Sequence, residues 1–165
     1  MKKFFIVFFF LMAGCGFSPL YNESLTKQGS LPVLVDPIPN QYGVSMRQRI
    51  LSKVGRSEHP VYTLSVSAPS FSSDDQTIDS KNFATMMSVS GTANYSLVDK
   101  KTQKQIIKST TSASGSYSVT KDPYASTIAE RKVKKELAEQ IADQIAQHVL
   151  VVLSKENNES KTLSN

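Results

Sequence analysis

The side chain with the clearest capacity for chemistry is Cys15, the only cysteine among the 165 residues. A lone cysteine cannot form a disulfide within its own chain, and its thiolate is a good nucleophile. Two small residues, Ala13 and Gly14, precede it. Small side chains would let the cleft of a peptidase close on the backbone there. The pattern predicts cleavage before Cys15 and transfer of a diacylglycerol to its sulfur.

The residues before Cys15 have the order of charged and apolar residues that a secretory signal peptide requires. Lys2 and Lys3 give a positive start, and residues 4–12 form an apolar run without a charge. That run is about nine residues long, far short of the roughly 20 that a membrane-spanning helix needs. Residues 12–15, Met-Ala-Gly-Cys, resemble the lipobox of bacterial lipoproteins. The alternative is an ordinary signal peptide followed by a buried cysteine.

A lipid on Cys15 would fix the protein to a membrane. A second modification, an acyl chain such as palmitate on the freed amine, would give an anchor of several chains, and each buried methylene contributes about 0.8 kcal/mol. Gly16 follows the cysteine. In enteric-type sorting Asp at this place retains lipoproteins at the inner membrane, whereas Gly resembles the outer-membrane class. We expect an outer-membrane protein on the periplasmic side.

Composition and motifs argue against nucleic-acid binding and against catalysis. Loss of Lys2 and Lys3 with the signal lowers the formal charge from +5 to +3, which is mild for a nucleic-acid binder. His59 and His148 lie far apart, and the pair Asp74–Asp75 lacks metal-ligand spacing. There is no Gly-rich phosphate loop or nucleophile elbow. We expect no enzyme activity, no metal and no cofactor.

Hydrophobic periodicity predicts an α+β domain. Met46, Ile50 and Val54 recur at four-residue steps, as in an amphipathic helix, whereas apolar residues alternate with polar ones over 83–97. The expected fold is a two-layer β-α-β-β-β-α sandwich, with a mostly antiparallel four-stranded sheet and two helices packed on one face. The expected elements are strand 31–36, helix 42–54, strands 61–68, 83–97 and 106–119, and a helix opened by Asp122 and Pro123.

These elements divide the chain into four regions. We expect a signal peptide at 1–14, a lipidated tether at 15–30, the α+β domain at 31–153 and a flexible tail at 154–165. The long helix should carry a solvated face of i,i+4 ion pairs and an apolar stripe. The stripe comprises Ile128, Val133, Leu137, Ile141, Ile145 and Val149.

Two polar surfaces are candidates for contact with other molecules. The first is the outer face of the sheet, rich in hydroxyl groups that bond in many geometries. We assign to it Ser65, Ser67, Ser88, Ser90, Thr92, Ser109 and Thr111. The second is a group of lysines near strand ends and a turn, whose ammonium groups suit phosphates and carboxylates. They are Lys81, Lys100, Lys101, Lys104 and Lys108. The alternative is that these lysines serve only solubility.

The segment that begins at Cys15 also carries a family resemblance. Residues 15–21, Cys-Gly-Phe-Ser-Pro-Leu-Tyr, are similar to the start of the LptE lipoproteins, especially the alphaproteobacterial branch. Residues 116–118 and 123–125, followed by the alanine-spaced helix, resemble that branch too. The expected order of strands and helices matches the family's fold. The resemblance covers most of the mature chain.

The resemblance implies a role in lipopolysaccharide (LPS) transport. LptE proteins sit largely inside the outer-membrane barrel LptD, assist its assembly and contact LPS on its way to the outer leaflet. The lysines would then meet the phosphates and carboxylates of lipid A and the inner core. The alternative is an accessory lipoprotein of another envelope machine, such as a lipid-transport complex or a cell-wall synthase activator, that acts only through protein contacts.

Overall fold

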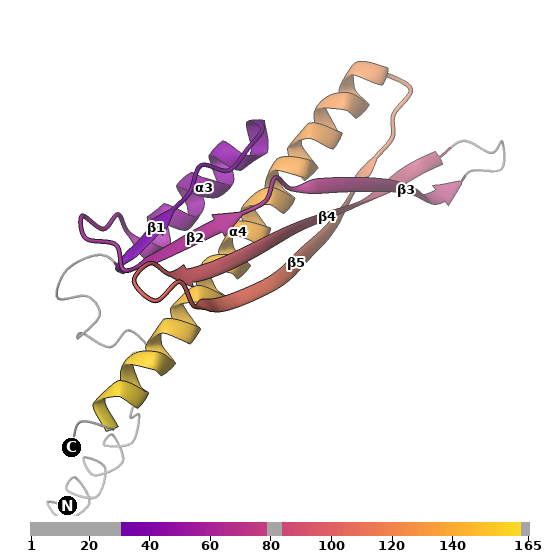
Figure 1. Ribbon diagram of the computed structural model, residues 1–165. Helices are drawn as coiled ribbons and strands as arrows, with labels where there is room; N and C mark the ends of the chain where they lie inside the picture. The colour runs from indigo at the N-terminus through magenta and orange to yellow at the C-terminus, as the bar shows by residue number, and fades with distance from the viewer. Residues whose placement is uncertain (1–30, 79–83, 163–165) are drawn as a thin grey trace, which may run out of the picture.

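The computed structural model describes residues 31–78 and 84–162, so Cys15, the tether, Lys81 and Phe83 lie outside the described residues. Figure 1 shows two helices lying across one face of a twisted sheet. The two-layer α+β arrangement predicted from periodicity is confirmed. In chain order the elements are β1 (Val33–Val35), α3 (Gln41–Val54), β2 (Tyr62–Val66), β3 (Ser70–Ile78), β4 (Ala84–Asp99), β5 (Gln105–Ser118) and α4 (Pro123–Thr162).

The sheet has five strands, one more than the sequence predicted. β1 runs parallel to β2 after a crossover through α3, and the other pairs are antiparallel. β5 pairs with β4 along most of its length, while β2 pairs with the segment 95–99 of β4 and β3 with the segment 84–92. β2 and β3 therefore lie end to end on the same edge of β4, and the sheet is four strands wide.

β3 is the strand that periodicity missed. Its sequence, Ser-Phe-Ser-Ser-Asp-Asp-Gln-Thr-Ile, has one apolar residue, Phe71, in its first seven positions. Phe71 lies over Gly91, where an added Cβ would come within 3.0 Å of its ring. The backbone pairs with β4 from Ser70↔Thr92 onward. Main-chain hydrogen bonds to a neighbouring strand leave no mark on the order of side chains, so this strand has no alternation to detect.

The core lies between the helices and the inner face of the sheet. β4 contributes its odd-numbered residues Val89, Ala93, Tyr95 and Leu97, as the alternation predicted. α4 contributes Leu137, Ile141, Ile145 and Val149, together with Ala138, Ala142 and Ala146, which are all 0–1% exposed. Small alanines allow the helix to lie close to the strands. Ile128, predicted in the same stripe, is 43% exposed because it precedes the buried part of α4.

Asn40 and Gly55 define the two ends of α3. The Asn40 side chain accepts hydrogen bonds from the amides of Tyr42 and Gly43, which satisfies two donors that a helix start leaves free. Gly55 ends the helix with φ 76°, a backbone angle that glycine adopts without a Cβ clash. The predicted helix 42–54 is thus confirmed to within a residue at its start.

α4 begins as predicted and continues further. Tyr124 N donates to the Asp122 carboxylate at 2.9 Å, and Pro123 is the first helical residue. The helix extends to Thr162, so it includes most of the segment that the sequence assigned to a tail. Within the described part of the chain, no helix has the length and apolar character needed to cross a membrane.

Candidate functional site

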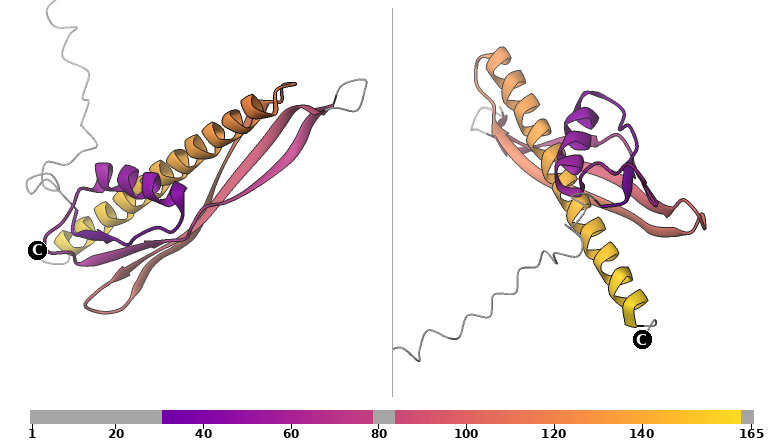
Figure 2. Two further views of the ribbon diagram at one scale, coloured as in Figure 1. Left: turned by 90° about the horizontal axis from the view of Figure 1, so that it is seen from above. Right: turned by 90° about the vertical axis from the view of Figure 1, so that its left-hand side faces the viewer.

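The helices leave the outer face of the sheet open, and this face is polar. Figure 2 shows both helices on the opposite side of the strands. Ser67, Thr92 and Asn94 are exposed there. The hydroxyl of Ser67 accepts from the Asn94 amide at 3.0 Å, and the Asn94 side chain accepts from Thr110 at 2.6 Å. This outer sheet face is a network of hydroxyls and amides with few charges.

Two of the residues that the sequence placed on the outer face point inward. Ser109 pairs with Tyr95 and Thr111 with Ala93, and both partners are buried against the helices. Thr111 donates to the side chain of Gln144 on α4. Both hydroxyls have the same strand parity as Ile107, which is buried, so the assignment to the outer face was wrong. The hydroxyl of Thr111 thus joins β5 to the helix layer.

A shallow hollow lies in the outer sheet face over β2, β4 and β5. Its volume is about 520 Å³. Lys108 is exposed on β5 and is the charged residue among those that line it. The outward-facing polar residues that line it are Ser65, Ser67, Asn94, Ser96 and Thr110. An ammonium group among hydroxyls and an amide is chemistry suited to sugar hydroxyls and to phosphate or carboxylate oxygens.

The turn between β4 and β5 gathers three of the five predicted lysines. The carboxylate of Asp99 accepts from Lys101 N at 2.7 Å and from Thr102 N at 2.9 Å. These backbone bonds, that from Thr102 foremost, hold the pKa of Asp99 below its usual value. The Asp99 carboxylate accepts from two backbone amides of the turn, so it stabilises the conformation of the turn. Lys100, Lys101 and Lys104 remain exposed around it.

Among the predicted lysines that the structure describes, Lys108 therefore does not share a surface with the three in the turn. Lys108 stands apart from the turn, on the outer sheet face opposite Ser96. Lys81 lies outside the described residues. The strand ends that flank it, Ile78 and Ala84, pair at the end of the sheet remote from the lysine turn. The pairing of β4 with β5 places Lys108 on the outer sheet face and the other three lysines in the turn, a difference that their positions in the sequence did not show.

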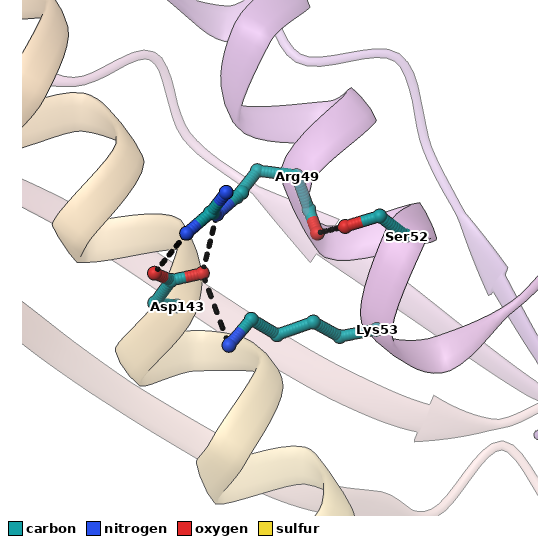
Figure 3. A network of polar contacts seen from close by, with 4 residues as sticks. All are labelled: Arg49, Ser52, Lys53 and Asp143. Carbon is teal, nitrogen blue, oxygen red and sulfur yellow. Dashed lines mark hydrogen bonds and ion pairs between the residues drawn. The ribbon is translucent and has the colours of Figure 1, made fainter.

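An ion-pair cluster that the sequence did not reveal joins the two helices (Figure 3). Asp143 on α4 accepts from Arg49 at 2.8 and 3.0 Å, and Lys53 lies 3.3 Å from the same carboxylate. The hydrogen bond from Arg49 is the largest cause of the lowered pKa of Asp143. Arg47 donates from Nε to Val35 O at 3.2 Å. Basic side chains of α3 thus contact β1 and α4, the elements that lie next to it.

Further polar and charged side chains of the described residues pair with one another, within α4 and between α4 and the sheet. Tyr95 and His148 share a hydrogen bond of 2.5 Å between the phenol oxygen and Nδ1. The charged face of α4 forms the predicted i,i+4 pairs, Lys134–Glu130, Lys132–Glu136 and Lys135–Glu139. Among residues 31–78 and 84–162, no group of three or more metal-ligating side chains comes together.

Comparison with known families decides the identity. The family model LptE, described as lipopolysaccharide-assembly, matches residues 27–149. The chain belongs to the LptE family. This is a family of LPS-assembly lipoproteins, so the family resemblance predicted from the sequence is confirmed, while residues 15–21 lie outside the matched range. A search of curated proteins finds no match to the chain.

Solved structures show that the fold of this LptE-family chain recurs in bacterial lipoproteins. A lipoprotein from Caulobacter crescentus has a TM-score of 0.56 at 18% identity, covering 76% of this chain and 92% of that one. Rare lipoprotein B from Shewanella oneidensis has 0.55 at 11%, covering 81% and 98%. Lipoprotein B from Nitrosomonas europaea has 0.56 at 11%, covering 77% and 90%. At these identities the likeness concerns the fold alone.

Proposed function

We propose that this LptE-family protein is the lipoprotein subunit of the outer-membrane LPS translocon. A lipid on Cys15 anchors it on the periplasmic side. The domain occupies the lumen of an LptD-like barrel, assists the assembly of that barrel and contacts LPS on its way to the outer leaflet. The protein acts by binding and performs no catalysis. The observation that carries this proposal is the family match across residues 27–149.

The outer sheet face supports a location inside a barrel. The lumen of a transmembrane barrel is polar, so a plug needs a polar surface with few buried charges. Thr92, Asn94 and Thr110 present hydroxyl and amide groups there. Such groups bond to many partners without the desolvation cost of a buried ion. The outer sheet face is therefore the surface we assign to the barrel wall.

The hollow beside Lys108 is the proposed LPS contact on that face. Its hydroxyls and the Asn94 amide suit sugar hydroxyls, and the Lys108 ammonium suits a phosphate or carboxylate of the inner core. The lysines of the β4–β5 turn belong to a different surface, at the end of the sheet.

Site-specific photo-crosslinking tests both the partner and the surface. A photoreactive amino acid at Thr92, exposed on the outer sheet face, should crosslink to a large outer-membrane barrel. The matched position is Gln48, exposed on α3 in the helix layer, and it should crosslink less. Crosslinking from Gln48 alone would reverse the assigned surface. Recovery of no barrel from outer membranes would refute the translocon role and favour an accessory of another envelope machine.

A further inference from the structure

β5 borders the sheet along its whole length. Among the described residues it pairs with β4 alone, from Val98↔Gln105 to Met86↔Ser118. Figure 1 shows β5 on the side of β4 opposite to β2 and β3. A border strand has main-chain N–H and C=O groups that no neighbouring strand uses. Within the described chain, the second side of β5 is therefore open to a further strand.

The hydrogen bonds of β4 show which residues of β5 face this open side. Ser67 N donates to Asn94 O at 2.8 Å, so Asn94 directs its main-chain groups toward β2. In an antiparallel ladder both main-chain groups of a residue point to the same neighbour, and successive residues alternate. The odd-numbered residues of β4 therefore serve their partners on β5, such as Thr111 opposite Ala93. The even-numbered residues of β5 direct their main-chain groups to the open side. They include Thr110, Ser112, Ser114 and Ser116.

The open side of β5 lacks the features that usually keep a border strand from pairing, which are charges, proline, bulges and short length. Residues 109–118 contain no charged residue and no proline, and their pairing with β4 has no register shift. The border at β3 differs, because Asp74 and Asp75 are exposed on it and its register shifts after Asp75. β1, the remaining border strand, is three residues long. The chain thus protects its other borders and leaves β5 unprotected.

Burial gives a second reason to expect a partner at β5. Val89 and Ala93 of β4 are 0% and 2% exposed beneath the helices. Their partners on β5, Gly115 and Thr111, are only half-buried. The helix layer therefore covers β4 more completely than β5. A strand added to β5 would cover this remaining surface, so it would gain side-chain contacts as well as main-chain hydrogen bonds.

We propose that β5 receives an extended segment of the barrel protein as an added strand. The proposal rests on the lumen location in the proposed function, because that location makes the barrel the neighbour of the sheet. The strands of a closed barrel already use their main-chain groups on both sides, so the added strand must come from a loop that enters the lumen. β5 also borders the outer sheet face, which is the surface assigned above to the barrel wall.

The side chains of β5 define the composition of the segment that fits. Main-chain pairing supplies affinity for an extended chain, whereas the side chains beside it supply specificity. Ser112, Ser114 and Ser116 present hydroxyl groups, and hydroxyl side chains pair favourably with Thr and Ser across a ladder. A charged residue in the segment would find no counter-ion among residues 109–118. We therefore expect an uncharged segment rich in Thr and Ser.

Crosslinking at successive positions of β5 tests strand addition. The mature lipoprotein carries a short diazirine amino acid at Ser112, Ser114 or Ser116, which are all exposed, and mass spectrometry identifies the peptides crosslinked in outer membranes. Each step of two residues along β5 should move the crosslinked position by two residues along one barrel segment, because paired strands keep their register. Crosslinks to a second copy of this chain, to residues 16–30, or to barrel positions without the two-residue step would overturn the proposal.

Proline supplies a matched pair of variants. Ser114→Pro removes an N–H that faces the open side and keeps the bonds to β4, so the barrel recovered with the lipoprotein should fall about fivefold, as for one main-chain hydrogen bond. Ser73→Pro is the control, because Ser73 pairs with Val89, whose main-chain groups serve β5, so the Ser73 N–H faces away from the sheet. Proline is tolerated at such border positions, so both melting temperatures should stay near that of wild type. Equal recovery from the two variants would overturn the proposal, and the crosslinking series decides the matter if Ser114→Pro does not fold.

Thr92 separates a failure of strand addition from a failure of the translocon role. Crosslinking to a barrel from Thr92 but not from Ser114 would overturn strand addition and leave the translocon role intact. Crosslinking from neither position would refute the translocon role together with the strand addition that rests on it. Crosslinking from both, with the two-residue step along β5, is the expected result.

Discussion

Arg49 on α3 and Asp143 on α4, 94 positions apart in the chain, form a two-pronged ion pair with N···O distances of 2.8 and 3.0 Å. A planar guanidinium matches a carboxylate in this geometry. Lys53, one helical turn after Arg49, adds a second cation at 3.3 Å. The pair links the short helix to the long one at a point that solvent reaches.

Stability should depend on pH through Asp143. The pKa of Asp143 is lowered in the folded protein, chiefly by the bond from Arg49. A lowered pKa means that the ionised carboxylate stabilises the fold above the unfolded-state value of about 3.9, and that this contribution disappears as pH falls through the lower folded-state pKa. The melting temperature of Asp143→Asn should lie below that of wild type at pH 7 and converge with it near pH 2. Glu136→Gln, in the exposed pair with Lys132, should match wild type throughout. A constant difference at all pH values would contradict the ionic explanation.

Asn40 should separate a helix cap from a backbone constraint. Its φ of 69° and ψ of 173° belong to a region that glycine adopts freely and other residues adopt with strain. Asn40→Ala keeps the strain and loses the cap, so the free energy of unfolding should fall by about 1 kcal/mol. Asn40→Gly also loses the cap but relieves the strain, so its stability should equal or exceed that of wild type. Urea denaturation measures both. Equal destabilisation by the two variants would disprove the strain at this position.

Gly43 is required by a close approach in the first turn of α3. A Cβ on this residue would lie 2.5 Å from Ile38 O, a backbone atom that cannot rotate away. Gly43→Ala should therefore cost about 1–3 kcal/mol despite the better helix propensity of alanine. Gly115→Ala is the matched control, since its nearest atom is Val133 Cγ1 at 3.4 Å. Thermal unfolding of the two variants should show a loss at position 43 and little change at 115.

Lys108 should contribute to LPS binding through the hollow on the outer sheet face. Lys108→Glu places a negative charge where phosphates are proposed to bind, so the Kd of the mature lipoprotein for LPS should rise about tenfold, in line with the worth of a charge-assisted bond. Lys132→Glu, on the solvated face of α4, makes the same change of charge elsewhere. An equal loss in both variants would indicate a general charge effect and remove the hollow from consideration.

Cys15 should control processing of the precursor. Cys15→Ser removes the sulfur that would accept the diacylglycerol, so the protein should retain residues 1–14 and incorporate no labelled palmitate. Mass spectrometry of the membrane fraction measures both outcomes. Cleavage at the same bond in the serine variant would favour the ordinary signal peptide.

Several features of the domain follow from residue order alone. The alternation in β4 identified its buried face, and the four-residue steps from Met46 to Val54 identified α3. Asp122 and Pro123 marked the start of α4. These signals are local, because a helix turn or a strand pleat imposes its period on whichever residues must be buried. The spacing of the buried residues was therefore enough to predict these helices and this strand face.

The tertiary structure decided everything that depends on which segments meet. β3 exists because its backbone pairs with β4, and a polar sequence carries no sign of that pairing. Thr111 turns out to face α4, and Asp143 to face Arg49 across 94 positions. The sequence alone determined which residues could be buried, charged or acylated. Only the folded chain determined that Lys108 lies on another surface than the lysines of the turn, and that Asp143 meets Arg49. Contacts between segments that are distant in the chain leave no periodic pattern in the sequence.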